Sequence, residues 1–146
     1  MSPYFILDDS TLNLIINRAL CGVEVKIFLP QIPDKFFVYN LSKSNAEKLL
    51  DYGVKVYLVK DTFLHSKVIV NENFAIVGSI NMDLRSFYQQ FECAVFTDDI
   101  SLITSVIEDF SKTQLNSKEI FKDEKKNKNP ISKIILSAMQ LFAPLM

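Results

Sequence analysis

The chain contains few of the residues that mark specialised classes of sequence. Its 146 residues include two cysteines, three glycines and five prolines. Two cysteines are too few for a disulfide scaffold, so we expect reduced thiols, as in the cytosol. The small number of glycines and prolines excludes a collagen-like or low-complexity chain, and a hydrophobic share of 49% argues against disorder. The length therefore predicts a single domain with a hydrophobic core of its own.

Long apolar runs and an excess of one charge are also missing. No segment provides the ~20 apolar residues of a membrane-spanning helix, and Met1–Tyr4 lacks the basic region of a secretory signal. Sixteen basic and seventeen acidic residues give a net charge of −1, so no nucleic-acid partner is expected. One histidine and two distant cysteines form no convincing metal cluster, and neither a metal nor another cofactor is expected.

The first third of the chain begins with a helix pattern that ends in a glycine. Apolar residues at helical spacing predict a helix over 12–20, with Asp9 or Ser10 as its N-cap. Gly22 lies where a glycine commonly follows a helix end. An alternating pattern over 23–29 then predicts a strand that is ended by a proline.

The same order recurs immediately afterwards. Ser44 and Glu47 form a capping-box signature that predicts the start of a second, short helix. Gly53 ends this helix, and an alternating strand covers 54–59. Two helix–glycine–strand units predict α/β layering with neighbouring parallel strands.

The second half is expected to complete a mixed β-sheet flanked by helices, so the predicted fold class is α/β. We expect a β-hairpin of strands 67–70 and 74–77 with a turn at 71–73, a strand over 91–96, and a helix capped by Asp98 or Asp99 that carries Ile103, Val106, Ile107 and Phe110 on one face. Residues 1–117 form the predicted main domain. Residues 118–130 are polar and rich in lysine, which predicts a linker, and residues 131–146 show the period of an amphipathic helix.

Chemistry-bearing residues gather around the expected hairpin. His65 and Lys67 are two apart on an extended segment, so their side chains are expected on the same face. Downstream, Gly78 is expected to let the backbone turn, and Ser79 and Asn81 follow at alternate positions. A lysine charge with hydroxyl and amide donors suits a phosphodiester, and a histidine can attack phosphorus or protonate a leaving oxygen. A lone His-x-Lys pair is more often structural, but the Gly-Ser-x-Asn element at this distance favours the catalytic interpretation.

These two elements resemble the H-x-K-x4-D-x6-G-S-x-N motif of the phospholipase D superfamily. Flanking segments narrow the resemblance to the second, C-terminal catalytic half of bacterial cardiolipin synthases. The segments that carry it are 2–9, 22–27, 52–57, 81–86, 91–92 and 141–145. The resemblance covers nearly the whole chain and is weakest from about residue 111 to residue 128. It implies one half of a phospholipase D-type fold.

The resemblance also implies an activity and roles for single residues. Enzymes of this family join two phosphatidylglycerols into cardiolipin and glycerol at the membrane, without a metal. His65 matches the histidine that protonates the departing alcohol and later deprotonates the incoming one. Lys67 and Asn81 match phosphate-binding residues, with Ser79 beside them. Glu92 matches a glutamate that holds the other ring nitrogen of the histidine, a role in which a carboxylate fixes the tautomer and stabilises the imidazolium.

The motif departs from the family pattern in one local feature. The spacing from His65 to Gly78 is one residue shorter than in the family. Asn71 or Glu72 therefore occupies the position of the motif aspartate, which in the family supports the local backbone and lies away from the phosphate. We expect the turn of the hairpin to absorb the missing residue.

The larger departure is that the chain has a single histidine. The family uses two facing motifs, because one histidine attacks phosphorus while the other handles the proton. We therefore expect a second motif-bearing chain, or a homodimer in which two copies of His65 face one phosphate. The expected substrate is phosphatidylglycerol. The expected location is the membrane surface on its cytoplasmic side, with no transmembrane segment in this chain.

Other residues and other functions stay open from the sequence. Arg85 could meet a second lipid phosphate or form a structural ion pair. Phe36, Phe37 and Tyr39 form an aromatic cluster that could cover an acyl chain, although core packing is the favoured interpretation. The alternative functions are a homodimeric, metal-independent phosphodiesterase or nuclease, and a truncated fragment that only binds a membrane or a partner.

Overall fold

The computed structural model describes residues 1–32, 34–124 and 138–140. The helix expected over 131–146 lies outside the described residues except at 138–140, which are helical. None of the helices within these described ranges is both long enough and apolar enough to cross a bilayer.

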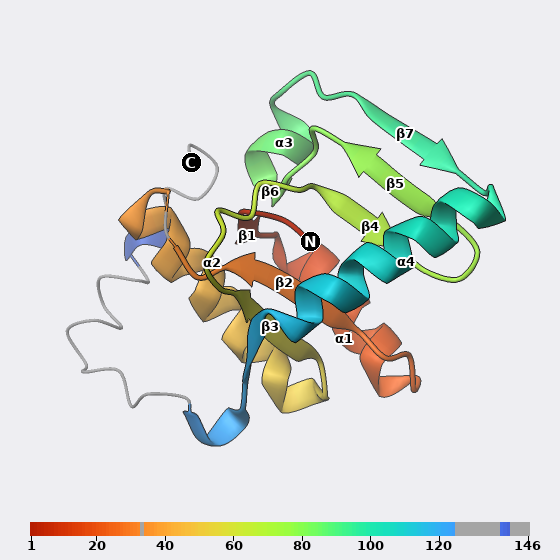
Figure 1. The fold of residues 1–146 in the computed structure, drawn as a ribbon. Helices are drawn as coiled ribbons and strands as arrows, with labels where there is room; N and C mark the ends of the chain where they lie inside the picture. Colours follow the sequence, from red (N-terminus) through yellow and green to blue (C-terminus); the bar gives the residue numbers. More distant parts are fainter. Residues whose placement is uncertain (33, 125–137, 141–146) are drawn as a thin grey trace.

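Helices and strands alternate through most of the described chain (Figure 1). In chain order the elements are β1 (Phe5–Ile6), α1 (Asp9–Leu20), β2 (Lys26–Pro30), α2 (Phe36–Leu49), the 3-10 helix η1 (Leu50–Tyr52), β3 (Lys55–Val59), β4 (Val68–Val70), β5 (Ala75–Gly78), β6 (Met82–Asp83), α3 (Leu84–Tyr88), β7 (Ala94–Thr97), α4 (Ile100–Leu115), β8 (Ser117–Ile120) and the 3-10 helix η2 (Lys122–Glu124).

The strands pair in three short ladders rather than in one uninterrupted sheet. β2 and β3 are parallel, as the repeated helix–glycine–strand pattern predicted, and β8 adds to β3 in antiparallel orientation. β4, β5 and β7 form an antiparallel ladder, and β1 pairs with β6 in parallel. Parallel and antiparallel pairs with helices packed around them confirm the predicted mixed α/β class.

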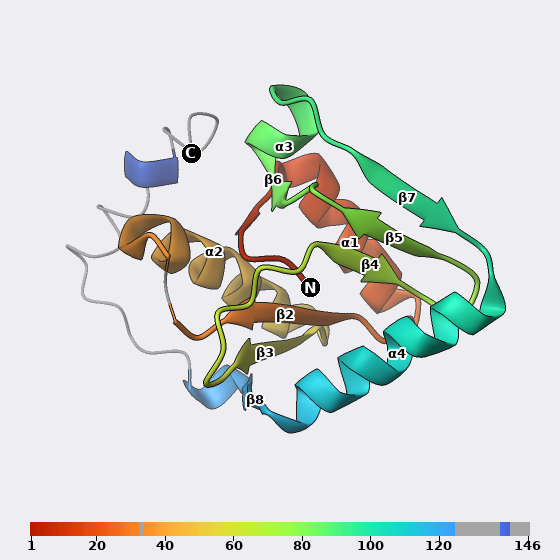
Figure 2. The same cartoon turned by 45° about the horizontal axis from the view of Figure 1, so that its top comes forward.

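The two faces of the β2–β3 pair are covered by different helices (Figures 1 and 2). Successive strand residues point to opposite faces, so Val56 and Leu58 pack in the core cluster that α1 and α2 supply. Tyr57 lies on the other face with Phe28, which stacks on it with ring centroids 4.9 Å apart. Phe110 of α4 meets Phe28 edge to face at 5.4 Å. This aromatic group therefore fixes α4 to the sheet.

α1 begins one residue earlier than the sequence pattern predicted. Its N-cap is Asp8, whose carboxylate accepts a hydrogen bond from the Thr11 backbone N–H at 2.9 Å, so the expected Asp9 or Ser10 cap is wrong. Hydrogen bonds from Ser10 and Thr11 to the Asp8 carboxylate lower the pKa of Asp8, and the bond from Ser10 contributes most. Gly22 follows the helix with φ of 89°, the left-handed conformation in which glycine is favoured.

α2 begins at Phe36, so the predicted helix start at Ser44 and Glu47 is wrong. Ser42 and Asn45 lie on the buried face of α2 and bond to β1: the Ser42 hydroxyl accepts from the Phe5 N–H at 3.0 Å. Polar residues at core positions interrupt the apolar period of this helix. This interruption explains why the pattern revealed only the C-terminal part of the helix.

Phe36 and Phe37 are exposed, which makes the expected core packing of this aromatic cluster wrong for both of them. Phe36 is 68% exposed and Phe37 is 63% exposed. Tyr39, the third member, is half-buried. The two phenylalanines occupy the first turn of α2.

The expected hairpin is confirmed, and its turn accommodates the shorter motif. β4 and β5 pair with Val70 opposite Ala75. The Asn71 side chain accepts from the backbone N–H groups of Asn73 and Phe74, each at 2.8 Å. Asn71, one of the two residues expected at the position of the motif aspartate, therefore closes the turn.

Several predicted boundaries in the remaining chain differ from the structure, and the strand expected over 91–96 runs from Ala94 to Thr97. Residues 118–120 were expected in a polar linker but belong to β8, which completes the β2–β3 ladder. Ile120 is buried at 5% exposure, so a single apolar residue in a charged segment anchors this strand. The strand expected over 23–29 begins only at Lys26. α4 has Asp99 as its N-cap, one of the two caps that were expected.

The packing of Phe28, Tyr57 and Phe110 between the sheet and α4 leads to a prediction about stability. Phe28→Ala removes a ring that is 1% exposed and that contacts both Tyr57 and Phe110, so the free energy of unfolding should fall by about 3–5 kcal/mol. Urea denaturation followed by circular dichroism measures this change. Phe91→Ala is the matched control, because Phe91 is fully exposed and its removal should change stability by less than about 0.5 kcal/mol. Equal losses for the two variants would contradict this account of the core.

Candidate active site

His65 lies on the extended segment that connects β3 to β4. The segment is fixed at its start by the Lys60 N–H, which donates to the Asn116 carbonyl at 3.0 Å, and in its middle by the buried Leu64. The His65 side chain itself is exposed. Its ring stacks on that of Phe63, with centroids 5.5 Å apart and planes 20° apart. The imidazole is therefore accessible and supported on one side by an aromatic ring.

Lys67 is half-buried beside this segment, and its side chain turns back toward the histidine backbone. Its Nζ donates to the His65 carbonyl oxygen at 2.7 Å. Burial lowers the pKa of Lys67, while the negative charges of Glu92 and Asp83 act in the opposite direction. The ammonium group is thus placed in a partly desolvated position, where a cation attracts an anionic ligand more strongly than in bulk water.

The hairpin brings the two halves of the motif together. The Gly78 N–H donates to the Lys67 carbonyl at 3.2 Å, so the His-x-Lys and Gly-Ser-x-Asn elements lie on directly bonded strands. Gly78 does not turn the chain through a left-handed conformation, as the sequence suggested. A Cβ at this position would lie 2.3 Å from the Cys93 carbonyl oxygen and 2.5 Å from the Ala94 Cα. The glycine is required because β5 approaches β7 closely here.

Glu92 is held in place by two serine hydroxyl groups. The Ser79 hydroxyl donates to one carboxylate oxygen of Glu92, and the Ser86 hydroxyl donates to the other at 2.9 Å. The Cys93 N–H donates to the Ser79 oxygen at 3.0 Å. Ser79 thereby connects the end of β5 to the residues that lead into β7.

The same hydrogen bonds determine the charge of Glu92. The bond from Ser79 contributes most to lowering the pKa of Glu92, the bond from Ser86 comes next, and the positive charge of Lys67 adds to both. Glu92 is therefore a carboxylate at neutral pH. Among the described residues, Glu92 accepts hydrogen bonds from the two serines and from the Gln90 amide, and the expected bond to the imidazole of His65 is not formed.

Ser86 and Asp83 are residues of the site that the motif analysis did not select. Ser86 is buried at 5% exposure, and its oxygen accepts from the Asn81 N–H at 3.2 Å while its hydroxyl donates to Glu92. The Asp83 carboxylate caps α3 by accepting from the Ser86 N–H at 2.7 Å. Burial raises the pKa of Asp83. The Asp-x-x-Ser spacing of a helix start was the sequence signal that could have identified this pair.

Asn81 has an unused hydrogen-bonding atom at the centre of this network. Its side-chain oxygen Oδ1 is buried and has no hydrogen-bond partner in the structure. A buried polar oxygen without a partner is costly. The Asn81 side chain therefore carries a hydrogen-bond acceptor that the described residues do not use.

Arg85 is exposed on α3, next to this network. With the Gln90 amide in the orientation that satisfies both of its groups, Gln90 donates to Glu92 at 3.0 Å and accepts from the Arg85 Nε at 2.9 Å. The arginine is thus linked to Glu92 through one intervening amide. The other N–H groups of Arg85 can serve either expected role, which is to bind a second lipid phosphate or to form a structural ion pair.

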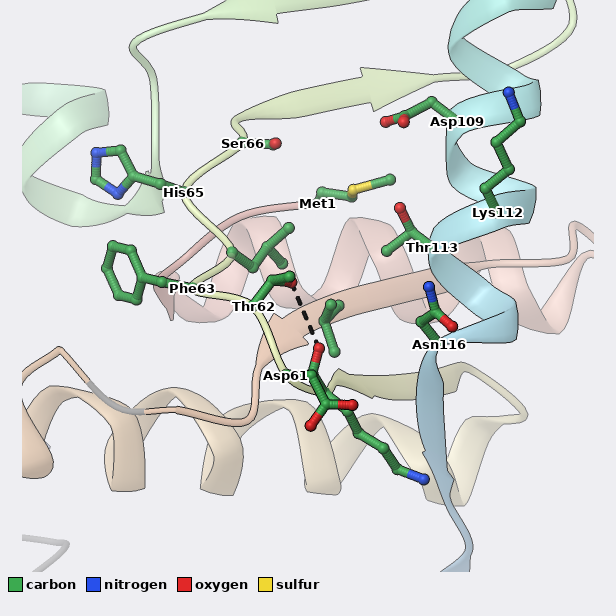
Figure 3. Close-up of a pocket in the computed structure, with 13 residues that line it drawn as sticks. Met1, Asp61, Thr62, Phe63, His65, Ser66, Asp109, Lys112, Thr113 and Asn116 are labelled. Atoms are coloured by element: carbon green, nitrogen blue, oxygen red, sulfur yellow. Dashed lines mark hydrogen bonds between the residues drawn. The ribbon is translucent and has the colours of Figure 1, made fainter.

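A cavity of about 490 Å³ opens on the α4 side of the His65 segment (Figure 3). Its walls are Met1, the segment from Val59 to Ser66, the α4 residues Asp109, Lys112 and Thr113, and Asn116, the C-cap of α4. Figure 3 shows His65 and Phe63 projecting away from α4, at the rim of this cavity. Lys67, Ser79 and Asn81 are not among the cavity-lining residues, so the phosphate-binding set that we expected lies outside it.

The structure thus joins Ser79, Ser86 and Glu92 by side-chain hydrogen bonds, bonds the Asn81 backbone to Ser86, and places the Lys67 ammonium group on the His65 carbonyl. Such a set can bind an anion with a cation and neutral donors, next to an accessible imidazole. Within the described ranges, no group of three or more His, Cys, Asp or Glu side chains is arranged to hold a metal ion.

A comparison with family models finds one match over residues 1–114. The matching family is described as the phospholipase D-like domain of cardiolipin synthase. Cardiolipin synthase 2 of Bacillus cereus is 39% identical to the chain over 146 residues, which is 99% of this chain and 28% of that protein. Cardiolipin synthase of Halalkalibacterium halodurans is 36% identical over 99% of this chain and 29% of that protein. The chain thus spans less than a third of the length of these relatives.

Solved structures share the fold at low sequence identity. Nuc of Salmonella typhimurium, a phospholipase D family member, matches with a TM-score of 0.69 at 18% identity, over 81% of this chain and 78% of that chain. Phosphatidylserine synthase of Haemophilus influenzae matches with a TM-score of 0.70 at 18% identity, over 99% of this chain and 38% of that chain. The comparison confirms the expected phospholipase D-type fold.

The hydrogen bonds from Ser79 and Ser86 to Glu92 lead to a prediction about the pKa of Glu92. Ser79→Ala and Ser86→Ala each remove a hydrogen bond to the carboxylate, so each should raise the pKa of Glu92, with the larger change for Ser79→Ala. Carbon-detected NMR titration of the Glu92 carboxyl group measures both. Ser66→Ala, which changes an exposed serine on the neighbouring segment, is the control and should leave this pKa unchanged.

The sign of the associated stability change follows from the lowered pKa. The Glu92 bonds stabilise the fold above the ordinary pKa of glutamate, and this contribution is lost as the pH falls through the lowered folded-state pKa. The two alanine variants should therefore lose stability at neutral pH and differ less from the unmodified chain in acid. Variants that leave the Glu92 titration unchanged would contradict the network described here.

Proposed function

The chain belongs to the family of phospholipase D-like domains found in cardiolipin synthases, and from this premise we propose that it acts in phosphatidyl transfer. The reaction joins two phosphatidylglycerols into cardiolipin and glycerol. The observation that supports the proposal is the backbone hydrogen bond from Gly78 to Lys67, because it pairs the His65–Lys67 segment with the strand that leads directly to Ser79.

Lys67 and Asn81 are the proposed phosphate-binding residues, and Ser79 assists them. The Lys67 ammonium group is half-buried and balances the charge of a phosphodiester anion. In this structure the Ser79 hydroxyl donates to Glu92. When a phosphate binds, this hydrogen can turn to a phosphate oxygen while Glu92 keeps its bond from Ser86.

The proposed reaction has two displacement steps and uses two histidines. In the first step, a ring nitrogen of one histidine attacks the phosphorus of a phosphatidylglycerol. The bond from phosphorus to the departing glycerol oxygen breaks, and the second histidine, which is protonated, gives its proton to that oxygen. Glycerol and a phosphohistidine linkage result.

In the second step, a hydroxyl group of another phosphatidylglycerol attacks the phosphohistidine. Its proton goes to the second histidine, the new phosphorus–oxygen bond forms, and the phosphorus–nitrogen bond breaks. Cardiolipin leaves and both histidines return to their starting states. His65 is assigned the acid–base role, and in a homodimer one copy of His65 would be the nucleophile while the other exchanges protons.

The second motif must come from outside this sequence, because His65 is its single histidine. The chain spans 28% and 29% of the relatives named above, so a motif on another segment or another chain is compatible with the family. Glu92 is the candidate to orient the imidazole once the site is complete, since it is ionised at neutral pH. We propose that the domain meets its lipid at the cytoplasmic face of the membrane.

A homodimeric phosphodiesterase is the second candidate function. It is favoured by the match to Nuc, because this chain covers 78% of that protein and the two are therefore of similar size. Both candidates use the same residues and differ in what attacks the phosphohistidine, an alcohol or water. The products of the reaction distinguish them.

The proposal predicts that His65→Ala abolishes activity. Purified chain incubated with phosphatidylglycerol vesicles should form cardiolipin and glycerol, detected by mass spectrometry, and removal of the imidazole should lower the rate by at least about a thousandfold. Ser66→Ala is the matched control, because it changes the residue between His65 and Lys67 without touching the network and should leave the rate unchanged.

The dependence of the specific activity on enzyme concentration tests whether a second copy of the chain supplies the second motif. If two copies of the chain share one site, the specific activity should rise with enzyme concentration. Absence of cardiolipin at high enzyme concentration would contradict phosphatidyl transfer by this chain alone. Hydrolysis of a soluble phosphodiester without cardiolipin formation would identify the phosphodiesterase instead.

A further inference from the structure

Three exposed phenylalanines lie where the chain leaves the carboxyl ends of β2 and β3. Phe36 and Phe37, 68% and 63% exposed, start α2 six and seven residues after β2 ends, and Phe63, 47% exposed, follows β3. β2 and β3 are parallel with Pro30 opposite Val59, so the segments that follow them emerge at the same edge of the sheet. We call these three residues the aromatic rim.

The aromatic rim is continuous with the candidate active site. The ring of Phe63 stacks on the ring of His65 at 5.5 Å. Figure 3 shows the two rings projecting together, on the side of the segment that faces away from α4. The imidazole therefore has an exposed apolar surface as its direct neighbour.

The chemistry of the substrate explains why apolar surface is useful at this position. In a phospholipid, the phosphate is joined to the acyl chains by a single glycerol unit. A phosphate beside His65 would therefore bring the acyl region within a few bonds of the same place. A phosphodiesterase that acts on a water-soluble substrate has no such requirement.

The start of α2 has further features of a segment that contacts a lipid headgroup layer. Its N-cap, Lys35, makes no side-chain capping bond, and its first turn contains no acidic residue. The N–H groups of the first turn and the helix dipole therefore contribute partial positive charge beside the two phenylalanines, while the nearby Asp34 carboxylate accepts a hydrogen bond from the Tyr4 hydroxyl at 2.7 Å. Basic and aromatic residues together are typical of helices that lie at a membrane surface.

We propose that the aromatic rim enters the outer part of a bilayer that contains anionic phospholipid, and that it presents the lipid phosphate to His65. This inference rests on the proposed function and adds to it the surface through which the domain meets its substrate. Phe36 and Phe37 would lie among the upper acyl segments, with Lys35 at the level of the phosphates. Phe63 would contact the glycerol unit of the lipid that occupies the site.

The absence of tryptophan from the chain permits a direct test. Phe37→Trp introduces a unique fluorophore into the aromatic rim, and Leu20→Trp places one at a similarly exposed position, 67% exposed, at the end of α1. Because Leu20 precedes β2, it lies toward the opposite edge of the sheet. With phosphatidylglycerol vesicles, the emission of the Phe37→Trp protein should shift to shorter wavelength and be quenched by lipids brominated on the acyl chains, whereas that of the Leu20→Trp protein should not change.

Sedimentation with the same vesicles supplies the complementary measurement. Phe36→Ser with Phe37→Ser should weaken binding at least about tenfold, because two large apolar side chains no longer leave water. Leu14→Ser with Leu20→Ser, a pair of similar exposure on α1, should leave binding unchanged. Equal binding by the Phe36/Phe37 variant and the unmodified chain, or equal loss in the α1 variant, would overturn the proposal.

A soluble headgroup separates failure of this inference from failure of the proposed function. Glycerophosphoglycerol, the deacylated form of phosphatidylglycerol, should shift the NMR signals of Lys67 and Asn81 equally in the unmodified chain and in the Phe36/Phe37 variant. If the unmodified chain binds the headgroup normally but does not bind vesicles, the proposed membrane role of the aromatic rim is overturned and the proposed function is not. Loss of both would overturn the proposed function. A tryptophan shift that depends on protein concentration and not on vesicles would show that a second copy covers the rim.

Discussion

The pairing of β5 with both β4 and β7 is the constraint on which the candidate site depends. Through β4, this pairing bonds Gly78 to Lys67, and through β7 it brings Gly78 against the Cys93 carbonyl so closely that no side chain fits. Ser79, one residue later, is consequently within reach of Glu92. The chemistry of the motif is thus a consequence of strand register. A chain with the same motif residues, but with its strands paired in a shifted register, would point these side chains to opposite faces of the sheet.

Much of the fold could be predicted from the sequence, because its periodic segments agree with their final environment. The parallel β2–β3 pair, the hairpin and the Asp99 cap follow from local patterns that tertiary structure did not override. α2 could not be delimited, since Ser42 and Asn45 occupy core positions and satisfy their polar groups on the β1 backbone. These hydrogen bonds join residues about 40 positions apart in the chain, so no pattern in the sequence around Ser42 and Asn45 indicates them.

The candidate site shows the same division between local and long-range information. Spacing predicted that Lys67 and Ser79 would converge, and the hairpin brings them together. The Asp-x-x-Ser spacing can indicate that Asp83 and Ser86 start a helix, but it could not reveal that Ser86 would also bridge Asn81 and Glu92, because those contacts depend on the tertiary fold. Glu92 was expected to bond to His65 but bonds to two serines. Its carboxylate is held by these hydrogen bonds, which also lower its pKa.

The central claim is that Lys67, Ser79, Asn81 and His65 surround one phosphate position. A crystal structure of the chain with orthovanadate, which imitates a phosphorus centre under attack, tests this claim most directly. The account predicts vanadium within bonding distance of a His65 ring nitrogen, with its oxygens hydrogen-bonded to Lys67 and Asn81. Vanadate bound in the cavity beside Lys112 and Asn116, with the four motif residues unchanged, would contradict it.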